Sequence, residues 1–278
     1  MEGKLHVRGA DLWYRITGEG EPVVQIHGAG FGHFNFDPAT PELSKHFRVI
    51  DYDMRGYGQS DRPLQDYDME VWADDLAGLM DGLEIDQAHV HGTSMGGMIA
   101  IVFAAKYPER TRSVVINCAA AKLGASGRLI FKNWIDIARL DPDGPGSRLL
   151  AELITWQALS RRFLAEQDDV ALADTIQQIL RDSNRVEVFT AACQAMCDMD
   201  LRPWLERITS PALVLGGDED LMTPWDQGPD GAGQQAIADG IPDAETYVVR
   251  GANHSTIFDS SDEHNRVVID FFRRHSAA

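Results

Sequence analysis

The sequence predicts an α/β protein with a doubly wound, mostly parallel sheet and a helical cap inserted between two core strands. Short apolar runs that end in Gly or Asp alternate with longer segments of helical periodicity, as strands and crossover helices do. Residues 122–205 interrupt this alternation with helical periodicity alone. The chain has 278 residues, which is long enough to bury one large core. We therefore expect one core with an insertion.

Seven short apolar runs are the expected strands. They lie at residues 12–17, 23–27, 47–51, 88–91, 113–117, 212–215 and 246–249. Two of the segments between them are expected core helices, at residues 69–82 and 98–107. The first has apolar residues at helical spacing and is expected to be amphipathic, whereas the second is almost wholly apolar and is expected to be buried.

Residues 122–205 are the expected cap, and residues 1–121 and 206–278 are the expected core. Helical periodicity in the cap covers residues 129–140, 149–163 and 170–180. A turn-rich stretch of Asp, Pro and Gly at residues 141–146 breaks the cap after its first helix. No stretch of linker composition separates the cap from the core, so we expect an insertion that packs on the sheet.

Charge and composition exclude several classes of partner. The 25 Lys and Arg residues against 43 Asp and Glu give a net charge of −18, which repels nucleic acid and anionic lipid. No run approaches the roughly 18 apolar residues that a membrane-spanning helix needs. The first residues lack the basic start and long apolar stretch of a secretory signal, so the expected location is cytoplasmic. The expected partner is a small molecule, and the sequence is compatible with a homodimer.

The most informative segment, residues 90–98, contains the pattern Gly-x-Ser-x-Gly between an apolar strand and an apolar helix. This context is typical of a nucleophile elbow, a sharp turn that exposes its serine above the sheet. Gly92 and Gly96 would allow close backbone approach, and Ser94 would stand at a helix N-terminus, where negative charge is favoured. Ser94 is therefore the predicted nucleophile.

A serine hydroxyl is a weak nucleophile at neutral pH and needs a histidine base with an orienting acid. Three acids, Asp218, Glu219 and Asp220, follow the expected strand at 212–215, and His254 follows the strand at 246–249. Ligands of an open parallel sheet gather at the carboxyl ends of its strands, where both segments are expected. Of the nine histidines, His254 is the predicted base.

The chain resembles enzymes of the α/β-hydrolase fold over its whole length, at four separate motifs. Besides the elbow, residues 27–30 (His-Gly-Ala-Gly) resemble the oxyanion loop of that family, and residues 53–60 resemble its turn after the next strand. Gly217, Asp220 and Pro224 have the spacing that marks the acid in that family. The resemblance therefore implies that Asp220 is the acid.

The same resemblance implies an oxyanion hole that consists of backbone N–H groups. Met95 follows the nucleophile and would supply one, and Ala29 would supply the other, while the ring of His27 would be structural. The resemblance implies no cofactor and no metal. The sequence also lacks an H-E-x-x-H motif, and its three cysteines are too scattered for a zinc site.

Three groups of serine α/β-hydrolases resemble different parts of the chain. Residues 94–98 and 191–201 are similar to the enol-lactonase group. Residues 27–32 and the Ser-Met-Gly-Gly sequence at residues 94–97 are similar to hydrolases that cleave a C–C bond of ring-fission products. Thr93 and Ser255 depart from that second group, which usually carries Asn and Trp at these positions. Simple carboxylesterases and cofactor-free haloperoxidase-like enzymes are the third group.

We therefore expect hydrolysis of an ester or lactone, with C–C hydrolysis of a vinylogous diketone as the alternative. A non-catalytic ligand-binding receptor on the same fold is the alternative from another class. A nucleotide site is also conceivable, because residues 28–33 follow a strand and Asp51 and Asp53 lie beyond it. Its fingerprint fails at the last glycine, which is displaced to Gly32 and followed by an aromatic-rich stretch.

The cap is expected to set the substrate. Candidate pocket residues are the apolar and aromatic side chains Phe31, Trp134, Trp156 and Met196. Four arginines could anchor a substrate carboxylate but are more simply explained as solvated helix faces: Arg128, Arg161, Arg162 and Arg185. The net charge of −18 favours neutral esters or lactones over dicarboxylates.

Overall fold

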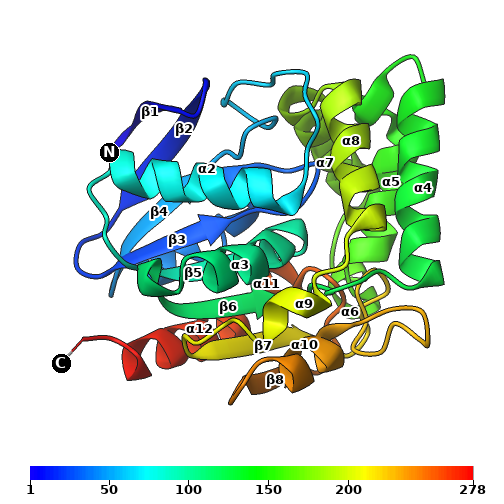
Figure 1. The fold of residues 1–278 in the computed structure, drawn as a ribbon. Helices are drawn as coiled ribbons and strands as arrows, with labels where there is room; N and C mark the ends of the chain where they lie inside the picture. The colour runs from blue at the N-terminus through cyan, green and yellow to red at the C-terminus, as the bar shows by residue number, and fades with distance from the viewer. Residues whose placement is uncertain (278) are drawn as a thin grey trace.

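A computed structural model describes residues 1–277. Its centre is an eight-stranded sheet in the order β1-β2-β4-β3-β5-β6-β7-β8, with helices on both faces (Figure 1). The pairs β1–β2 and β2–β4 are antiparallel, and every pair from β4–β3 onwards is parallel. The structure therefore confirms the predicted fold class, a doubly wound, mostly parallel sheet.

All seven expected strands are present, and the sheet has one more at its edge. The strands are β1 (Glu2–Val7), β2 (Ala10–Thr17), β3 (Pro22–Ile26), β4 (Arg48–Tyr52), β5 (Ala88–Thr93), β6 (Thr111–Asn117), β7 (Ala212–Gly217) and β8 (Glu245–Val249). The first of them was not predicted. It forms a hairpin with β2 through Arg8 and Gly9, which have φ angles of 49° and 83°. Positive φ at both central residues is typical of a two-residue hairpin turn.

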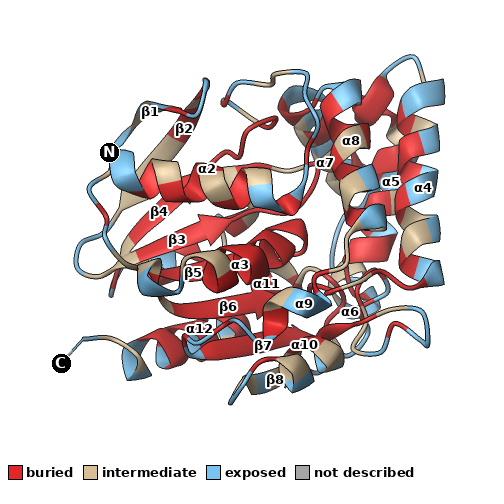
Figure 2. Cartoon of the chain, in the orientation of Figure 1, coloured by how far each residue is buried: buried red, intermediate tan, exposed pale blue. Residues whose placement is uncertain are grey.

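Core helices cover both faces of the sheet. On one face lie α2 (Met69–Gly82), α3 (Met95–Lys106), α9 (Arg202–Leu205) and α10 (Gln234–Gly240); on the other lie α1 (Thr40–Leu43), α11 (Thr256–Asp259) and α12 (Ser261–Arg274). Three short 3-10 helices connect elements: η1 (His33–Phe36), η2 (Pro108–Arg110) and η3 (Gly144–Gly146). The buried residues form two apolar clusters, one on each side of the strands (Figure 2).

Six α-helices lie between β6 and β7, within residues 122–205, which we call the cap segment. The last of them, α9, packs on the core helices α3 and α10. The other five are α4 (Ala125–Leu140), α5 (Arg148–Ala158), α6 (Arg161–Leu164), α7 (Asp169–Ser183) and α8 (Val186–Asp198). Helix α4 packs on α8, and α5 packs on α7, beyond one end of the sheet (Figure 1). The expected single helix at residues 149–163 is in fact two helices.

The break between α5 and α6 falls at Leu159 and Ser160, whose backbone is extended. Ser160 accepts a hydrogen bond from the N–H of Phe163 at 3.2 Å, so it caps α6. Its own N–H donates to Asp259 at 3.0 Å. A tertiary partner thus ends the first helix, which periodicity within the cap segment could not indicate.

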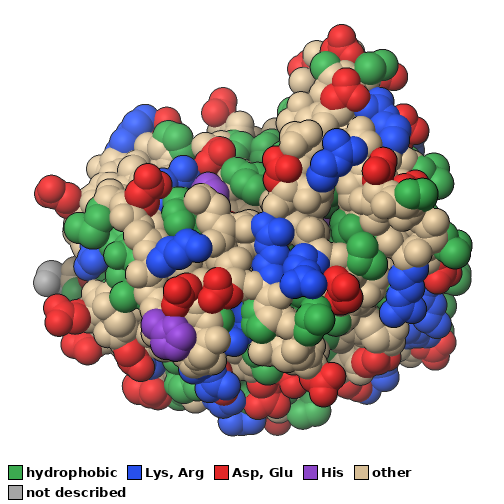
Figure 3. Space-filling view, turned by 90° about the horizontal axis from the view of Figure 1, so that it is seen from above, with side chains coloured by type: hydrophobic (Ala, Val, Ile, Leu, Met, Phe, Trp, Pro, Cys, Tyr) green, Lys and Arg blue, Asp and Glu red, His purple; other side chains and the backbone are tan. Residues whose placement is uncertain are grey.

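Charge is spread over the molecular surface. On the face seen from above, acidic and basic side chains are interspersed among polar and small apolar groups (Figure 3). Within the described residues, no helix combines the length and apolarity that crossing a membrane would require.

Candidate active site

The turn between β5 and α3 brings Ser94 to the end of the sheet. Ser94 has φ 56° and ψ −122°, a conformation that non-glycine residues rarely adopt and that is typical of strained functional turns. A Cβ on Gly96 would lie 1.9 Å from the carbonyl oxygen of Ile26, and a Cβ on Gly92 would lie 2.2 Å from that of Gly96. Both glycines are therefore required by close backbone contacts, and the expected elbow geometry is present.

Three separate turns bring the side chains of Ser94, His254 and Asp220 together. The Oγ of Ser94 lies 2.9 Å from Nε2 of His254, and Nδ1 of His254 lies 3.1 Å from both carboxylate oxygens of Asp220. An ionised carboxylate only accepts hydrogen bonds, so Nδ1 carries the ring proton and Nε2 is left to accept a proton from the serine. The structure thus brings together the three residues that the sequence singled out.

Asp220 is held by the turn that follows it. Its Oδ1 accepts the backbone N–H groups of Met222 and Thr223, each at 2.9 Å, and its Oδ2 accepts the hydroxyl of Thr223 at 2.9 Å. Burial raises the pKa of Asp220, but the neighbouring His254 and the hydrogen bonds from Thr223 outweigh that effect and hold the pKa below its usual value. Asp220 is therefore an anion that faces the histidine.

The neighbouring acids do not compete for this position. Asp218 accepts the N–H of Gly251 at 2.6 Å and pairs with Arg250 on the surface, and Glu219 is exposed. The spacing that selected Asp220 over its two neighbours therefore agrees with the geometry.

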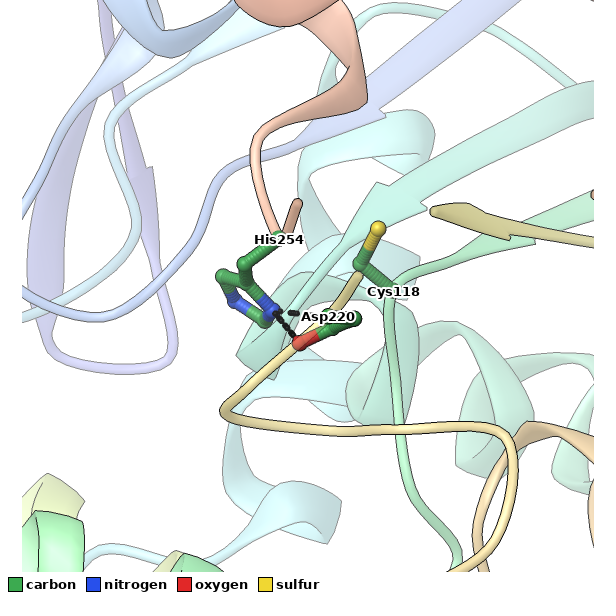
Figure 4. Close-up of side chains that lie close together, drawn as sticks. All are labelled: Cys118, Asp220 and His254. Carbon is green, nitrogen blue, oxygen red and sulfur yellow. Dashed lines mark hydrogen bonds and ion pairs between the residues drawn. The ribbon is translucent and has the colours of Figure 1, made fainter. Parts of the chain in front are cut away.

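Cys118 also lies close to the acid and the histidine (Figure 4). Its sulfur points away from the bonded pair, and burial raises the pKa of its thiol far above the usual value. Its backbone carbonyl oxygen lies 2.7 Å from the hydroxyl oxygen of Thr223 and competes with Asp220 for the single proton of that hydroxyl. Although Cys118, Asp220 and His254 could in principle hold a metal ion, the carboxylate of Asp220 is already bonded to the histidine and the turn. We assign Cys118 a packing role.

The loop after β3 lies against the nucleophile. A Cβ on Gly28 would lie 3.3 Å from the Cβ of Ser94, and the N–H of Gly28 donates to Oδ1 of Asn35 at 3.0 Å. Ala29 lines the cavity at Ser94, and Met95 is the first residue of α3. The first N–H groups of a helix have no partner within the helix, so the N–H of Met95 is not used by α3, while Ala29 lies in the loop that follows β3. Their catalytic role is a proposal.

His27 and Asp53 brace this loop. Nε2 of His27 accepts the N–H of Met54 at 3.0 Å, so its Nδ1 carries the proton and donates to the carbonyl of Gly28 at 2.8 Å. Burial lowers the pKa of His27 to about 4, which keeps the ring neutral. Asp53 accepts the N–H of His33 at 2.7 Å. The geometry agrees with the structural role implied for His27.

The nucleotide alternative is not supported by this arrangement. Asp51 is fully buried and is bonded to Thr40 and Arg15, and Asp53 is fully buried against His33. The loop after β3 leads into the short 3-10 helix η1 instead of a long helix that could face a pyrophosphate.

A cavity beside Ser94 and His254 opens between the core and the cap segment. It encloses about 990 Å³, including the open space at its mouth. Its apolar wall includes Phe31, Phe34, Phe131, Trp134, Ile154 and Ile176.

Two of the four predicted pocket residues line this cavity and two do not. Phe31 and Trp134 line it. The prediction for Trp156 is wrong, because α5 turns Ile154, Thr155 and Ala158 toward the cavity and leaves Trp156 53% exposed on another face. The prediction for Met196 is also wrong. Its side chain is fully buried in the apolar core, where α8 packs on α4.

Sequence reasoning missed three residues that support the site. Thr223 holds Asp220, and Gln234 donates to Asp220 at 3.3 Å and to the carbonyl of Thr223 at 2.7 Å. Asn35 fixes Gly28. The sequence contained one signal, since an Asp followed three residues later by Thr is a typical side-chain-to-backbone turn. Gln234 and Asn35 reach the site only through the tertiary fold.

Comparison with known proteins agrees with this geometry. The alpha/beta hydrolase fold family matches residues 21–261. The chain belongs to the α/β-hydrolase family. Its matched region spans the elbow, the acid turn and the histidine.

Individual α/β-hydrolases match most of the chain. A 2-hydroxy-6-oxo-6-phenylhexa-2,4-dienoate hydrolase of Comamonas testosteroni is 30% identical over 95% of this chain and 91% of that protein. A 2-hydroxy-6-oxo-2,4-heptadienoate hydrolase of Pseudomonas putida is 43% identical over 75% of each. The crystal structure of the enol-lactonase from Burkholderia xenovorans LB400 superposes with a TM-score of 0.87 at 29% identity, over 98% of this chain and 100% of that one.

Asp220→Asn is expected to lower kcat by about 10⁴-fold if Asp220 orients the histidine. The two backbone N–H groups that Oδ1 accepts would hold the amide oxygen, so the new NH₂ group would face His254. The ring would then carry its proton on Nε2 and could not accept one from Ser94. Asp218→Asn, on the surface two residues away, is the matched control. Retention of more than about a tenth of wild-type kcat by Asp220→Asn would exclude this role.

Proposed function

We propose that this protein is a serine hydrolase that cleaves a carboxylic ester or a lactone through an acyl-enzyme. One observation carries the proposal: an unbroken chain of hydrogen bonds runs from Ser94 through His254 to Asp220 beside an apolar cavity. Nucleophile, base and orienting acid in this order are the parts that acyl transfer from a serine requires.

In the first half of the proposed reaction, Oγ of Ser94 attacks the carbonyl carbon and its proton passes to Nε2 of His254. The backbone N–H groups of Ala29 and Met95 stabilise the oxyanion that forms. Asp220 stabilises the positive charge on the ring. His254 then gives the proton to the leaving alkoxide, which departs as an alcohol or, for a lactone, stays attached as the far end of the chain.

In the second half, water attacks the acyl-enzyme and gives its proton to His254. The same N–H groups stabilise the second oxyanion, and the proton returns to Oγ of Ser94 as the carboxylic acid is released. All groups that this cycle needs lie within the site, and the leaving group gains one proton while the acyl group gains one hydroxyl.

Cleavage of a C–C bond is the second candidate function, because two of the relatives are named dienoate hydrolases. Thr93 and Ser255 weigh against it. Both positions line the cavity beside Ser94 and His254, so the departures from the C–C hydrolase pattern fall at the site itself. The enol-lactonase that superposes over the whole chain supports the ester or lactone reaction.

A substrate panel tests the proposal. It comprises p-nitrophenyl and alkyl esters, simple lactones and a vinylogous diketone, each corrected for spontaneous hydrolysis. We expect turnover of esters or lactones and labelling of Ser94 by a fluorophosphonate, detected as a mass shift on its peptide. Turnover of the diketone alone would replace the proposal by C–C hydrolysis. Saturable binding without turnover or labelling would favour the receptor.

A further inference from the structure

The wall of the cavity beside Ser94 is uncharged. Throughout the described chain, no Lys, Arg, Asp or Glu contributes to it. The rings of Phe131 and Trp134 pack edge to face in this wall, with centroids 5.0 Å apart. Nε1 of Trp134 donates to Gln157 at 2.9 Å, so the one polar atom of this ring already has its partner. The wall therefore offers a substrate mainly carbon surface.

Two hydroxyl groups in the wall are committed to the protein. Thr155 and Thr175 donate to carbonyl groups of their own helices, those of Ala151 at 2.7 Å and Ala171 at 2.9 Å. Thr93 accepts a hydrogen bond from Asn117 at 2.9 Å and keeps its own proton. The remaining donors of the wall are uncharged, so an anionic group deep in the cavity would meet no cation.

The four arginines considered as carboxylate anchors do not line the cavity. Arg128 donates to the carbonyl of Leu123 at 2.6 Å, and Arg162 donates to Ser260 at 3.0 Å. Arg185 lies 3.7 Å from Glu187, and Arg161 is exposed. Their interpretation as cations of the surface and of local turns agrees with the structure.

We propose that the site takes neutral, apolar esters or lactones and discriminates against substrates whose buried part carries a carboxylate. This inference rests on the proposed function and names its substrate class. A carboxylate that leaves water without gaining a cation loses most of its hydration uncompensated, because a few uncharged donors cannot replace it, whereas an alkyl or aryl group gains by burial. The net charge of −18 adds a long-range repulsion that salt screens.

Two matched esters test the inference. They are p-nitrophenyl heptanoate and the p-nitrophenyl monoester of heptanedioic acid, which differ only in that a carboxylate replaces the terminal methyl group. We expect kcat/KM for the anionic ester to be at least about 100-fold lower, because the carboxylate is desolvated without a cation as its partner. The ratio should persist at about 0.5 M salt, where long-range repulsion is screened.

The outcomes separate this inference from the proposed function. Comparable rates for the two esters would overturn the inference and leave the serine hydrolase in place. A preference that disappears at high salt would also overturn it, because the net charge and not the wall would then be responsible. Failure to hydrolyse any ester or lactone, with Ser94 unlabelled by the fluorophosphonate, would instead overturn the proposed function.

A charge installed in the wall gives a second test. Thr175 lies in the wall on α7 and is exposed to solvent. Thr175→Arg is expected to raise the anionic-to-neutral ratio of kcat/KM about tenfold, as a nearby cation would. Thr175→Gln, which adds length without charge, is the matched control and should leave the ratio unchanged. An unchanged ratio in both variants would overturn the inference.

Discussion

Replacement of Ser94 by alanine is expected to lower kcat for the best ester or lactone by about 10⁵- to 10⁶-fold. The substitution removes the only hydroxyl that is bonded to Nε2 of His254 among the described residues. It leaves the oxyanion donors and the apolar wall intact, so the residual rate should be roughly 10³-fold above the uncatalysed reaction. Substrate binding should change little.

The fold should tolerate this change. Alanine has the same backbone restrictions as serine, because both carry a Cβ at the φ of 56° that the elbow requires. The free energy of unfolding of Ser94→Ala, measured in urea, should therefore stay close to that of the wild type. Loss of activity with loss of folding would leave the nucleophile untested, and this measurement separates the two.

Ser255→Ala is the matched control, because Ser255 also lines the cavity and directly follows His254. We expect this variant to keep fluorophosphonate labelling and most of its turnover. Turnover of Ser94→Ala within about 100-fold of the wild type would show that another group attacks the substrate, and the proposed mechanism would then be wrong.

The sequence predicted the sheet well because its buried parallel strands appear as short continuous apolar runs. Strand β7, for example, is buried at every position, and its residues 212–215 are all apolar. The edge strand β1 was missed, because its outward residues Glu2, Lys4 and His6 are exposed and only half of its alternation is apolar. Such polar residues are typical of sheet edges, where they discourage pairing with other chains.

Helix α12 was also missed, although the sequence held a signal for it. Val267, Val268, Phe271 and Phe272 are buried on one face, at the spacing of an amphipathic helix. This segment follows the last expected strand and the proposed histidine. It therefore does not connect two expected strands, and a helix was not inferred there. The error is one of interpretation, since the pattern itself was present.

The proposed catalytic residues could be predicted from sequence motifs, but the residues that form the wall of the cavity could not. Chain order and spacing were enough for Ser94, Asp220 and His254, because each follows a strand of the same sheet. The wall depends on the rotation of the cap helices about their axes. Periodicity shows that α5 has an apolar face, but not that Ile154 faces the cavity while Trp156 faces solvent.

Acidification is expected to destabilise the fold well above the pH at which carboxylates normally titrate. His27, His89, His91 and His264 are fully buried. Burial lowers the pKa of His27 and of His89 to about 4 and that of His264 to about 3. The pKa of His91 is also lowered, by burial first and then by the neighbouring His264.

The direction of this pH effect follows from the number of protons that the folded and the unfolded states bind. In the unfolded chain a histidine has a pKa near 6.5, so below that pH the unfolded state binds a proton that the folded state does not. Stability is therefore complete above about pH 6.5 and falls as the pH drops toward 4. Each such histidine lowers the free energy of unfolding by up to about 1.4 kcal/mol per pH unit in this window.

His91 and His264 are the clearest pair. Their rings stack with centroids 5.2 Å apart on the sheet face covered by α12. Nδ1 of His264 lies 3.1 Å from the hydroxyl of Thr256, which donates to Asn117, so this nitrogen carries the proton of the neutral ring. Protonation of either ring would place a charge beside the other in an apolar layer, and no carboxylate of residues 1–277 forms an ion pair with either ring.

Urea unfolding followed by tryptophan fluorescence at several values between about pH 5 and 7.5 measures this effect. Buried acids complicate the total, because burial raises the pKa of Asp51, Asp75 and Asp259, and these groups bind protons in the folded state at low pH. The test therefore compares the pH dependence of the free energy of unfolding between a variant and the wild type. His91→Leu should reduce the slope by about the contribution of one histidine, roughly 1.4 kcal/mol per pH unit at most.

His6→Gln is the control, because His6 is 72% exposed. Surface substitutions usually change stability by less than about 0.5 kcal/mol, so this variant should unfold close to the wild type at each pH. An identical slope for His91→Leu and the wild type would contradict the prediction, because the buried ring would then take up its proton in the folded state as readily as in the unfolded one. Such a result would require water or a carboxylate to reach the His91–His264 pair, and the layer beneath α12 would have to open before the molecule unfolds.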